Sequence, residues 1–317
     1  MILRSNELIT IFGGDGFIGR YVCEKLMKAG ARVRVASRDP RNSYYIQPLG
    51  QVGQFGFIKA DVTDKEAVRR ALDGAAAAIN LVGVFGRKMP AVHVEGARNI
   101  AEAAKKAGAE ALVHISAIGA DPQSRSNYGR TKAEGEAAVR KAFKSATIIR
   151  PSLAFGPEDE LTNRFAGMAR LPILPVIAAK RNFQPVYVRD LARAIALAAL
   201  DPARHGGKTY EIGGPQVMSM LELHQAVLQL TGQRPEILPL PDIAGTALSY
   251  FGWLPGAPLT RDQWLMLSHD NVPAKGAPGL EAFGIKPTPL AAVGSEWLGR
   301  FRGNRFAGRR VNVTAAS

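Results

Sequence analysis

The sequence predicts an α/β fold in which a Rossmann-type, doubly wound parallel sheet precedes a smaller mixed C-terminal lobe. Two observations favour this class. Short apolar runs alternate with amphipathic or Ala-rich stretches through the first half of the 317 residues, which is typical of βαβ units around a parallel sheet. A glycine-rich turn also follows the first apolar run directly, where a dinucleotide-binding fold requires one.

The predicted elements follow the chain in order. Strands are expected, as short apolar runs closed by turns, at residues 8–12, 32–36, 57–60, 78–82, 112–116 and 147–150. Helical patterns occupy residues 18–29, 65–72, 94–107, 128–143, 190–200 and 219–230. Asp190 is expected to cap the helix that it begins. We therefore expect a dinucleotide-binding domain over residues 1–150 and a mixed lobe, not necessarily contiguous in space, over residues 151–317.

Composition and charge narrow the class of protein. The single cysteine, Cys23, excludes an internal disulfide and a cysteine-built zinc site and indicates a reducing, cytoplasmic setting. The net charge of +14 favours a polyanionic neighbour, such as nucleic acid, an anionic membrane or a phosphate-rich ligand. No nucleic-acid motif accompanies the charge, so no nucleic-acid partner is expected. Neither a signal peptide nor a membrane-spanning helix is predicted, since Gly13 comes too early and no apolar run reaches 18 residues.

Two stretches of the second half break the α/β pattern. Residues 243–260 carry no charge and include Tyr250 and Phe251. A helix packed under the lobe is the favoured explanation, and a membrane-facing patch is the alternative. The tail at 300–310 holds five arginines and two phenylalanines. That tail suits acidic lipid head groups or an acidic partner, and a solvated tail explains it equally well.

The glycine-rich turn carries the strongest functional signal. Its glycines have G-x-x-G-x-x-G spacing after a strand and before a helix, which allows a tight turn and lets backbone N–H groups approach a pyrophosphate. The predicted cofactor-binding residues here are Gly13, Gly14, Asp15, Gly16, Phe17, Ile18 and Gly19.

The end of the second strand indicates which dinucleotide binds. Ser37 and Arg38 stand about 20 residues past the turn, where a carboxylate would hold the ribose 2′-hydroxyl of NAD(H). A hydroxyl and a guanidinium suit a 2′-phosphate instead. NADP(H) is therefore favoured over NAD(H), although the neighbouring Asp39 argues against this preference.

Further segments resemble the short-chain dehydrogenase/reductase superfamily, in its extended and atypical branches, over nearly the whole chain. The resemblance implies that Asp61 and Val62 hold adenine, and that a fourth-strand segment lies beside the cofactor. That segment contains Leu81, Val82 and Gly83. It also implies that residues 150–157, which include Pro151 and Ser152, lie along the nicotinamide end.

Tyr128 and Lys132 match the Tyr-x-x-x-Lys motif of that superfamily. Residues four apart share one face of a helix, so the ammonium is expected to lower the phenol pKa from about 10 and to let Tyr128 exchange a proton with substrate. The resemblance implies that Lys132 also holds the nicotinamide ribose.

One departure from the family limits the catalytic prediction. Active relatives place a hydroxyl one or two positions after Ser116, where this chain has Ala117 and Ile118, which cannot donate a hydrogen bond. Either Ser116 serves in a shifted geometry or the hydroxyl is absent. Loss of one positioned donor costs on the order of a hundredfold or more in rate.

The chain resembles most the atypical branch that contains the nucleotide-binding accessory subunit of respiratory NADH:ubiquinone oxidoreductase (complex I) and its bacterial homologues. The resemblance rests on residues 113–116, 148–159, 185–190 and 270–272. It implies tightly held NADPH in a structural or sensing role. Expected partners are complex I or quinone-biosynthesis proteins, at the inner face of an energy-transducing membrane that the basic tail contacts. The alternative is an active NADP-dependent oxidoreductase or sugar-nucleotide epimerase that uses Tyr128 and Lys132.

The remaining titratable residues give weak signals. The five histidines lack ligand spacing, so no metal site is predicted. His114 is expected to be a hydrogen-bonded core histidine, and Cys23 a small buried hydrophobe. Arg189 is a minor candidate for substrate binding.

Overall fold

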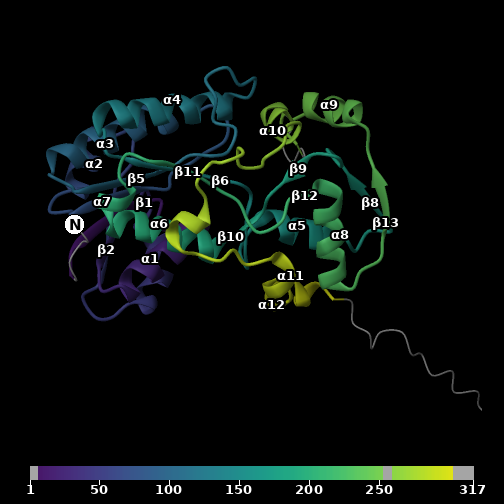
Figure 1. The fold of residues 1–317 in the computed structure, drawn as a ribbon, viewed down its shortest axis with the longest axis horizontal. Helices are drawn as coiled ribbons and strands as arrows, with labels where there is room; N and C mark the ends of the chain where they lie inside the picture. Colours follow the sequence, from purple (N-terminus) through teal and green to yellow (C-terminus); the bar gives the residue numbers. More distant parts are fainter. Residues whose placement is uncertain (1–5, 253–258, 303–317) are drawn as a thin grey trace, which may run out of the picture.

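The central element of the structure, a computed structural model that describes residues 6–252 and 259–302, is a seven-stranded parallel sheet (Figure 1). Its strand order is β11-β6-β5-β4-β1-β2-β3. The strands are β1 (Leu8–Phe12), β2 (Arg32–Ser37), β3 (Phe55–Lys59), β4 (Ala77–Asn80), β5 (Ala111–Ile115), β6 (Thr147–Pro151) and β11 (Thr209–Ile212). The Rossmann-type fold predicted from the sequence is confirmed.

The strand order reverses at β1, and this places the binding edge of the sheet. β1 pairs with β2 on one side and with β4 on the other, so Ile11 lies opposite both Val35 and Ile79. Chain connections leave in opposite directions from such a point, which opens a crevice at the carboxyl ends of the strands. β4 and β5 are buried along their whole length because both faces of the sheet are covered.

Helices cover the two faces of the sheet in separate layers (Figure 1). The helices α1 (Phe17–Lys28) and α6 (Val188–Leu200) share one apolar core with Ile9, Ile11 and Val113. A second core, on the other face, is formed with Phe12 and Leu112 by α2 (Lys65–Ala71), α3 (Ala97–Lys106) and α4 (Asn127–Ala142). The alternation of side chains along each strand divides its residues between these two cores.

A second lobe is built from segments that follow β6, and it lies beyond the carboxyl edge of the sheet (Figure 1). Three two-stranded ribbons belong to this half of the chain, β10–β7, β12–β9 and β13–β8. Their strands are β7 (Ala154–Phe155), β8 (Ile173–Val176), β9 (Asn182–Phe183), β10 (Val186–Tyr187), β12 (Met218–Ser219) and β13 (Glu236–Pro239). The remaining α-helices are α5 (Glu160–Met168), α7 (Pro202–His205), α8 (Met220–Thr231), α9 (Asp242–Tyr250), α10 (Arg261–Leu267), α11 (Leu290–Val293) and α12 (Ser295–Leu298). Across the whole described chain, 3-10 helical segments form η1 (Pro40–Leu49), η3 (Leu280–Phe283) and η4 (Gly299–Phe301), and a π-helical segment forms η2 (Pro90–Gly96).

The sheet also uses segments beyond residue 150. β11 pairs with β6, and α6 covers the sheet on the same side as α1. Residue 150 therefore lies within β6 and not at the end of the sheet.

Two local predictions need correction, and a third is confirmed. Asp190 does not cap its helix: Tyr187 is the N-cap residue of α6, and the Asp190 carboxylate accepts a hydrogen bond from Thr288 N–H at 2.7 Å. The helix expected at residues 94–107 is preceded by a π-helical turn, η2, and α3 begins only at Ala97. The prediction that His114 is a hydrogen-bonded core histidine is confirmed at one nitrogen: Nδ1 accepts from Asn80, while the buried Nε2 has no partner among the described residues.

The prediction for residues 243–260, a helix packed under the second lobe, also needs correction. Helix α9 forms there, but Ile243, Tyr250 and Phe251 are exposed instead of buried. Residues 253–258 of that segment, and residues 303–310 of the arginine-rich tail, lie outside the described residues. Within 6–252 and 259–302, no helix has the length and hydropathy needed to cross a membrane.

Candidate dinucleotide site

A cavity of about 820 Å³ opens at the carboxyl edge of the sheet, where β1 and β4 diverge. Its lining comes from the ends of β1, β2, β3 and β4 and from the turns that follow them. The lining residues are Gly13, Asp15, Gly16, Ala36, Ser37, Arg38, Asp39, Asn42, Ala60, Asp61, Val62, Thr63, Leu81, Val82, Gly83, Val84, Lys88, Ala91 and Val92. This is the place that the strand order predicts for a ligand.

The glycine-rich turn forms the base of the cavity. Gly13 has φ +75°, in the left-handed region that favours glycine. A Cβ at Gly19 would lie 2.5 Å from the Gly13 carbonyl oxygen, so α1 packs on the turn at a distance that only glycine permits. Gly16 is the N-cap of α1 and supplies no side-chain acceptor to the first turn. The helix N-terminus therefore keeps N–H groups available for an anion such as a pyrophosphate.

The end of β2 carries the residues that bear on a 2′-phosphate. Ser37 Oγ donates a hydrogen bond to Asp15 Oδ2 at 2.6 Å, and Arg38 lines the cavity beside it. Asp39 pairs with Arg41 at 2.8 Å, and the guanidinium holds the pKa of that carboxyl below its usual range. The negative charge of Asp39 is thus compensated, whereas the Asp15 carboxylate stays at the cavity wall.

The end of β3 supplies a preorganised acidic turn. Asp61 Oδ1 accepts hydrogen bonds from Thr63 N–H at 2.9 Å and from Thr63 Oγ1 at 2.7 Å, and these bonds lower the pKa of Asp61. Arg38 and Lys88 lower it further. Asn99 Nδ2 holds the turn by donating to the Val62 carbonyl at 3.0 Å. The carboxylate is therefore fixed and ionised beside the cavity.

Tyr128 and Lys132 lie on α4, beside the wall formed by Gly83. Lys132 Nζ donates to the Ile115 carbonyl at 3.1 Å and lies 5.7 Å from the centroid of the Tyr128 ring. Burial lowers the Lys132 pKa to about 8. A Cβ at Gly83 would lie 3.6 Å from Lys132 Nζ, which places the ammonium against that wall.

The Tyr128 ring is covered by aromatic neighbours. Phe85 stacks on it with centroids 4.9 Å apart, and His93 meets it edge-on at 5.4 Å. Burial raises the Tyr128 pKa to about 12, and Lys132 does not offset this rise. The expectation of a lowered phenol pKa is therefore wrong for this structure, because desolvation outweighs the charge of the lysine.

His93 is a site residue that the sequence pattern did not reveal. Its Nε2 accepts from Val84 N–H at 3.1 Å, so Nδ1 carries the proton and donates to Thr131 Oγ1 at 2.9 Å. Thr131 in turn donates to the Asn127 carbonyl at 2.8 Å. Burial lowers the His93 pKa to about 3, which keeps the ring neutral. The loop after β4 is thereby tied to the first turn of α4.

Ser116 is not part of the cavity lining. Its Oγ is buried and has no hydrogen-bond partner in the described part of the chain. The residues after β6 are engaged elsewhere: the Pro151 carbonyl accepts from Ile118 N–H at 3.2 Å, and Ser152 Oγ donates to the Asn271 carbonyl at 2.8 Å.

The structure thus brings together a large part of the predicted set. Cavity-lining members are Gly13, Asp15, Gly16, Ser37, Arg38, Asp61, Val62, Leu81, Val82 and Gly83. Predicted members outside the lining are Gly14, Phe17, Ile18, Gly19, Ser116, Tyr128, Lys132, Pro151 and Ser152. Lys88, Asn42 and Thr63 line the cavity but were not predicted. Of these, only the charge of Lys88 shortly after a predicted strand offered a signal.

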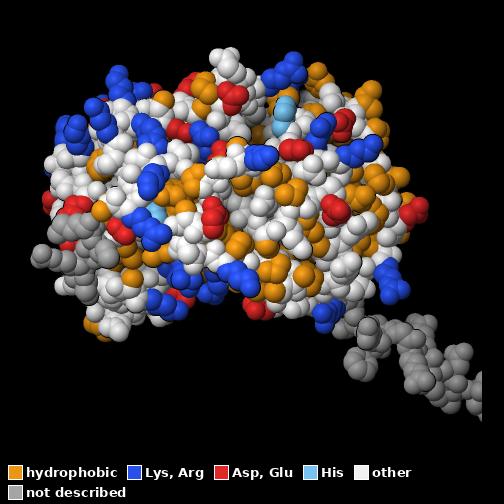
Figure 2. Space-filling view, in the orientation of Figure 1, with side chains coloured by type: hydrophobic (Ala, Val, Ile, Leu, Met, Phe, Trp, Pro, Cys, Tyr) orange, Lys and Arg blue, Asp and Glu red, His pale blue; other side chains and the backbone are white. Residues whose placement is uncertain are grey.

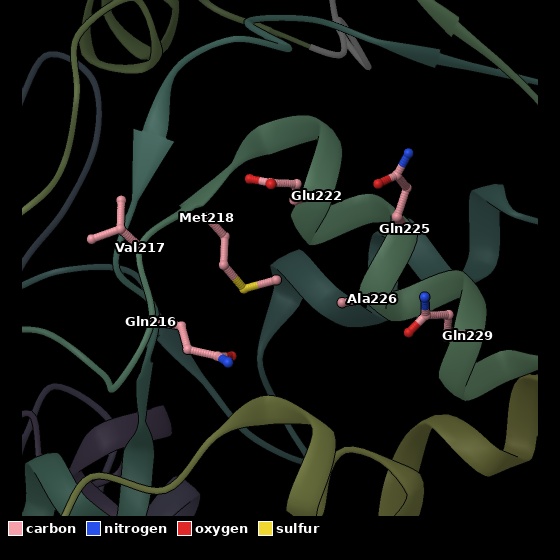
Figure 3. Close-up of a pocket in the computed structure, with 7 residues that line it drawn as sticks. All are labelled: Gln216, Val217, Met218, Glu222, Gln225, Ala226 and Gln229. Carbon is pink, nitrogen blue, oxygen red and sulfur yellow. The ribbon is translucent and has the colours of Figure 1, made fainter.

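A second, shallower cavity of about 500 Å³ lies between β12 and α8 (Figure 3). Its lining residues are Gln216, Val217, Met218, Glu222, Gln225, Ala226 and Gln229. Glu222, the single charged member, accepts hydrogen bonds from the backbone N–H and hydroxyl of Ser219 in a capping box. No cluster of His, Cys, Asp and Glu side chains suited to a metal ion occurs at either cavity or elsewhere in the described ranges.

The relatives described next match three quarters or more of this chain. NADH dehydrogenase (ubiquinone) 1 alpha subcomplex subunit 9, mitochondrial, from Rattus norvegicus is 34% identical over 319 residues, covering 98% of this chain and 84% of the relative. The NADH-ubiquinone oxidoreductase 40 kDa subunit of Neurospora crassa is 29% identical and covers 94% of this chain and 80% of its own. A ceramide reductase from Caulobacter vibrioides is 30% identical over 257 residues, 76% of each chain.

Solved structures share the fold at low identity. An epimerase from Methanothermobacter thermautotrophicus has a TM-score of 0.74 and 16% identity over 94% of this chain and 92% of its own. An Escherichia coli NADPH-dependent quinone oxidoreductase in complex with NADPH has a TM-score of 0.73 and 21% identity, covering 91% and 99%. A Thermus thermophilus UDP-glucose 4-epimerase in complex with NAD has a TM-score of 0.67 and 21% identity, covering 94% and 99%.

The part of the chain that matches a family model contains every lining residue of the cavity at the carboxyl edge of the sheet. The model for the NAD dependent epimerase/dehydratase family matches residues 9–213, which span the glycine-rich turn, every strand of the central sheet and the Tyr128–Lys132 pair. The chain belongs to the NAD dependent epimerase/dehydratase family, whose members bind a nicotinamide dinucleotide, and it is homologous to the alpha subcomplex subunit 9 of complex I.

Proposed function

We propose that this protein holds NADP(H) tightly in the cavity at the carboxyl edge of the sheet and serves as an accessory protein of a membrane-bound respiratory or quinone-related complex. The observation that carries the proposal is the 34% identity with a complex I subunit over 98% of this chain. The fixed glycine-rich turn and the uncapped N-terminus of α1 support the binding of a dinucleotide.

The preference for NADP(H) over NAD(H) rests on charge at the end of β2. Arg38 lines the cavity, and the carboxylate of Asp39 is paired with Arg41. Lys88 adds a second cation to the lining. Asp15 opposes a 2′-phosphate, but its Oδ2 already accepts from Ser37. A bidentate guanidinium contact to a phosphate is strong enough to dominate this balance.

The accessory role rests on the state of the catalytic positions. The bound dinucleotide would supply a hydride, whereas the protein must supply a proton donor and a hydrogen bond to the substrate oxygen. Ala117 and Ile118 provide no such hydrogen bond. Ser116 Oγ is buried, and Tyr128 is stacked under Phe85 with a raised pKa. These features favour retention of the cofactor without turnover.

A second candidate is an NADP-dependent reductase of a lipid-soluble carbonyl compound or quinone, with an epimerase as a variant on the same fold. The specific observation is the 30% identity with a ceramide reductase over 76% of this chain. Tyr128 and Lys132 keep the spacing that proton transfer requires, and the Lys132 pKa of about 8 suits a group that titrates near neutral pH.

Replacement of Tyr128 by Phe separates the two candidates. For the accessory role we expect NADPH to remain bound after desalting and any slow oxidation of NADPH by quinones or ketones to be the same in the variant and the parent. For the reductase, turnover should collapse at unchanged occupancy. Tyr250→Phe is the matched control, because it removes an exposed phenol hydroxyl in the second lobe.

The proposed setting is the cytoplasm and the inner face of an energy-transducing membrane, in contact with complex I or quinone-biosynthesis proteins. The complex I relatives and the net charge of +14 support this setting. Coprecipitation of the protein with detergent-solubilised membrane complexes tests it directly. Recovery of no membrane protein with NADPH-loaded bait would contradict the proposed partners and leave the nucleotide site unaffected.

A further inference from the structure

Helix α9 buries its small residues and exposes its large apolar ones. Its buried residues are Gly245 and Ser249, whereas large apolar side chains face outward. The exposed ones in and just after the helix are Ile243 at 77%, Leu248 at 40%, Tyr250 at 59% and Phe251 at 61%. We call these four residues the α9 patch. A surface helix ordinarily turns such residues inward, so the α9 patch is suited to a partner.

Close packing against α10 enforces this orientation. A Cβ at Gly245 would lie 2.4 Å from the Trp264 ring, so α9 meets α10 at a distance that a larger residue would prevent. Trp264 Nε1 donates to Thr246 Oγ1 at 3.1 Å and fixes the rotation of α9 about its axis. The side chains of the α9 patch therefore lie outside the contact between Gly245 and Trp264, while the Tyr250 ring lies 5.0 Å from the Arg261 guanidinium of α10.

The neighbouring ribbon extends the apolar surface. Strand β13 leads into α9 and pairs with β8, and these two strands carry exposed Leu238 and Ile173, each at 47%. Leu171, just before β8, is exposed at 51%. Figure 2 shows hydrophobic side chains gathered over this side of the second lobe, with Lys and Arg side chains among them.

Two exposed cations stand near the α9 patch, and the acids Glu236 and Asp242 are exposed there as well. Arg261 lies over the Tyr250 ring at 5.0 Å, and Lys180 is exposed. Two nearby acids are engaged by other groups: Asp242 pairs with Arg181 at 3.0 Å, and Asp262 accepts from Asn127 N–H at 2.6 Å. Apolar and aromatic side chains beside outward cations are the composition of a surface that lies in the interface of an anionic bilayer.

We propose that the α9 patch is the surface through which this protein contacts an anionic membrane. The inference deepens the proposed membrane setting and rests on it. Tyr250 and Phe251 enter the interfacial region of the bilayer, while Arg261 and Lys180 remain at the level of the lipid phosphates. The surface belongs to the described second lobe and includes none of residues 300–310.

Sedimentation with vesicles tests the inference on the full chain loaded with NADPH. We expect binding to vesicles of phosphatidylcholine mixed with phosphatidylglycerol and much weaker binding to phosphatidylcholine alone. Tyr250→Ser together with Phe251→Ser should weaken binding by about tenfold, since two aromatic side chains lose their apolar environment. The matched control is Tyr44→Ser with Phe57→Ser, an aromatic pair at the sheet edge exposed at 52% and 43%, which should bind within about twofold of the parent.

The outcomes separate this inference from the proposed function. Absence of vesicle binding by the parent, or equal binding of the parent and the Tyr250 and Phe251 variant, overturns the α9 patch as a membrane surface. NADPH is measured in the same fractions. A parent that retains NADPH and ignores vesicles refutes only the inference, whereas vesicle binding by a protein that cannot hold NADPH refutes only the nucleotide proposal. Unchanged thermal unfolding temperatures show that both variants are folded.

Discussion

The ring of Phe85 stacks on the ring of Tyr128, with centroids 4.9 Å apart and planes inclined by 19°. Phe85 itself is 58% exposed, so it acts as a cover between Tyr128 and solvent. This relationship joins the loop after β4 to the helix that carries Tyr-x-x-x-Lys. It also explains why Tyr128 is desolvated although a lysine lies nearby.

Removal of this cover should change the acidity of Tyr128. In Phe85→Ala, water reaches the phenol, and its pKa should fall from about 12 toward about 10. NMR titration of labelled tyrosine, assigned with Tyr128→Phe, measures the change. Phe251→Ala is the control with an exposed aromatic elsewhere. An unchanged Tyr128 pKa in Phe85→Ala would show that Phe85 does not cause the desolvation.

The glycine-rich turn gives a sharp steric prediction. Gly19→Ala should abolish dinucleotide binding, because the new Cβ would lie 2.5 Å from the Gly13 carbonyl oxygen and 2.6 Å from Gly14 backbone atoms. Gly167→Ala on α5 is the matched control, since a Cβ there meets nothing within 4 Å. The control should bind normally and gain about 0.5–1 kcal/mol in stability. Calorimetric titration with NADPH checks both variants, and normal binding by Gly19→Ala would contradict the proposed role of the turn.

The cofactor preference should depend on Arg38. Arg38→Leu removes the guanidinium proposed to bind the 2′-phosphate, so the Kd for NADPH should rise about tenfold or more while the Kd for NADH changes little. Arg69→Leu is the charge-matched control, because Arg69 lies on α2 outside the cavity lining and pairs with Glu66 at 2.9 Å. Equal losses for both nucleotides would mean that Arg38 does not read the phosphate.

The second lobe is joined to α4 by a carboxylate. Asp262 Oδ1 accepts from Asn127 N–H at 2.6 Å, and Oδ2 accepts from Tyr128 N–H at 3.2 Å. Asp262→Ala leaves these donors without their carboxylate and should cost about 1–2 kcal/mol in the free energy of unfolding. Asp262→Asn, which keeps an acceptor, should cost less. Equal stability of the parent and the Ala variant in urea unfolding would contradict the capping role.

Acid should destabilise the protein through His114. Burial lowers its pKa to about 3 in the folded state, against about 6.5 when unfolded. Between these values the unfolded chain binds more protons, so the stability present above pH 6.5 is lost as pH falls toward 3, by up to about 1.4 kcal/mol per pH unit. His114→Gln should flatten this slope and His269→Gln, at an exposed site, should not. Thermal unfolding across this range measures both, and an unaltered slope in His114→Gln would exclude His114 as the cause.

Local patterns sufficed to predict six of the seven strands of the central sheet and the glycine-rich turn at its carboxyl edge. The turn from Gly13 to Gly19 encodes its geometry in adjacent residues, and short apolar runs mark the strands because both faces of the sheet are buried. The apposition of β11 and β6 could not be predicted, since it joins segments about 60 residues apart by backbone pairing alone.

Contacts between distant segments account for the errors as well. The sequence placed Tyr128 and Lys132 on one helix, but it did not reveal the Phe85 ring from another loop that covers the phenol and accompanies its raised pKa. His93 is held by hydrogen bonds to Val84 N–H, in the loop after β4, and to Thr131 on α4. Neither contact leaves a motif in the sequence. The outward face of α9 follows from the contact between Gly245 and Trp264, which periodicity cannot reveal.

We propose that this protein binds NADP(H) tightly, and identification of the nucleotide that it carries is the direct test. The protein is purified without added cofactor and denatured, and the released nucleotide is quantified by mass spectrometry. We expect NADP(H) at close to one equivalent per chain. Release of NAD(H), or an empty protein that shows no binding of NADPH by calorimetry, would contradict the proposal.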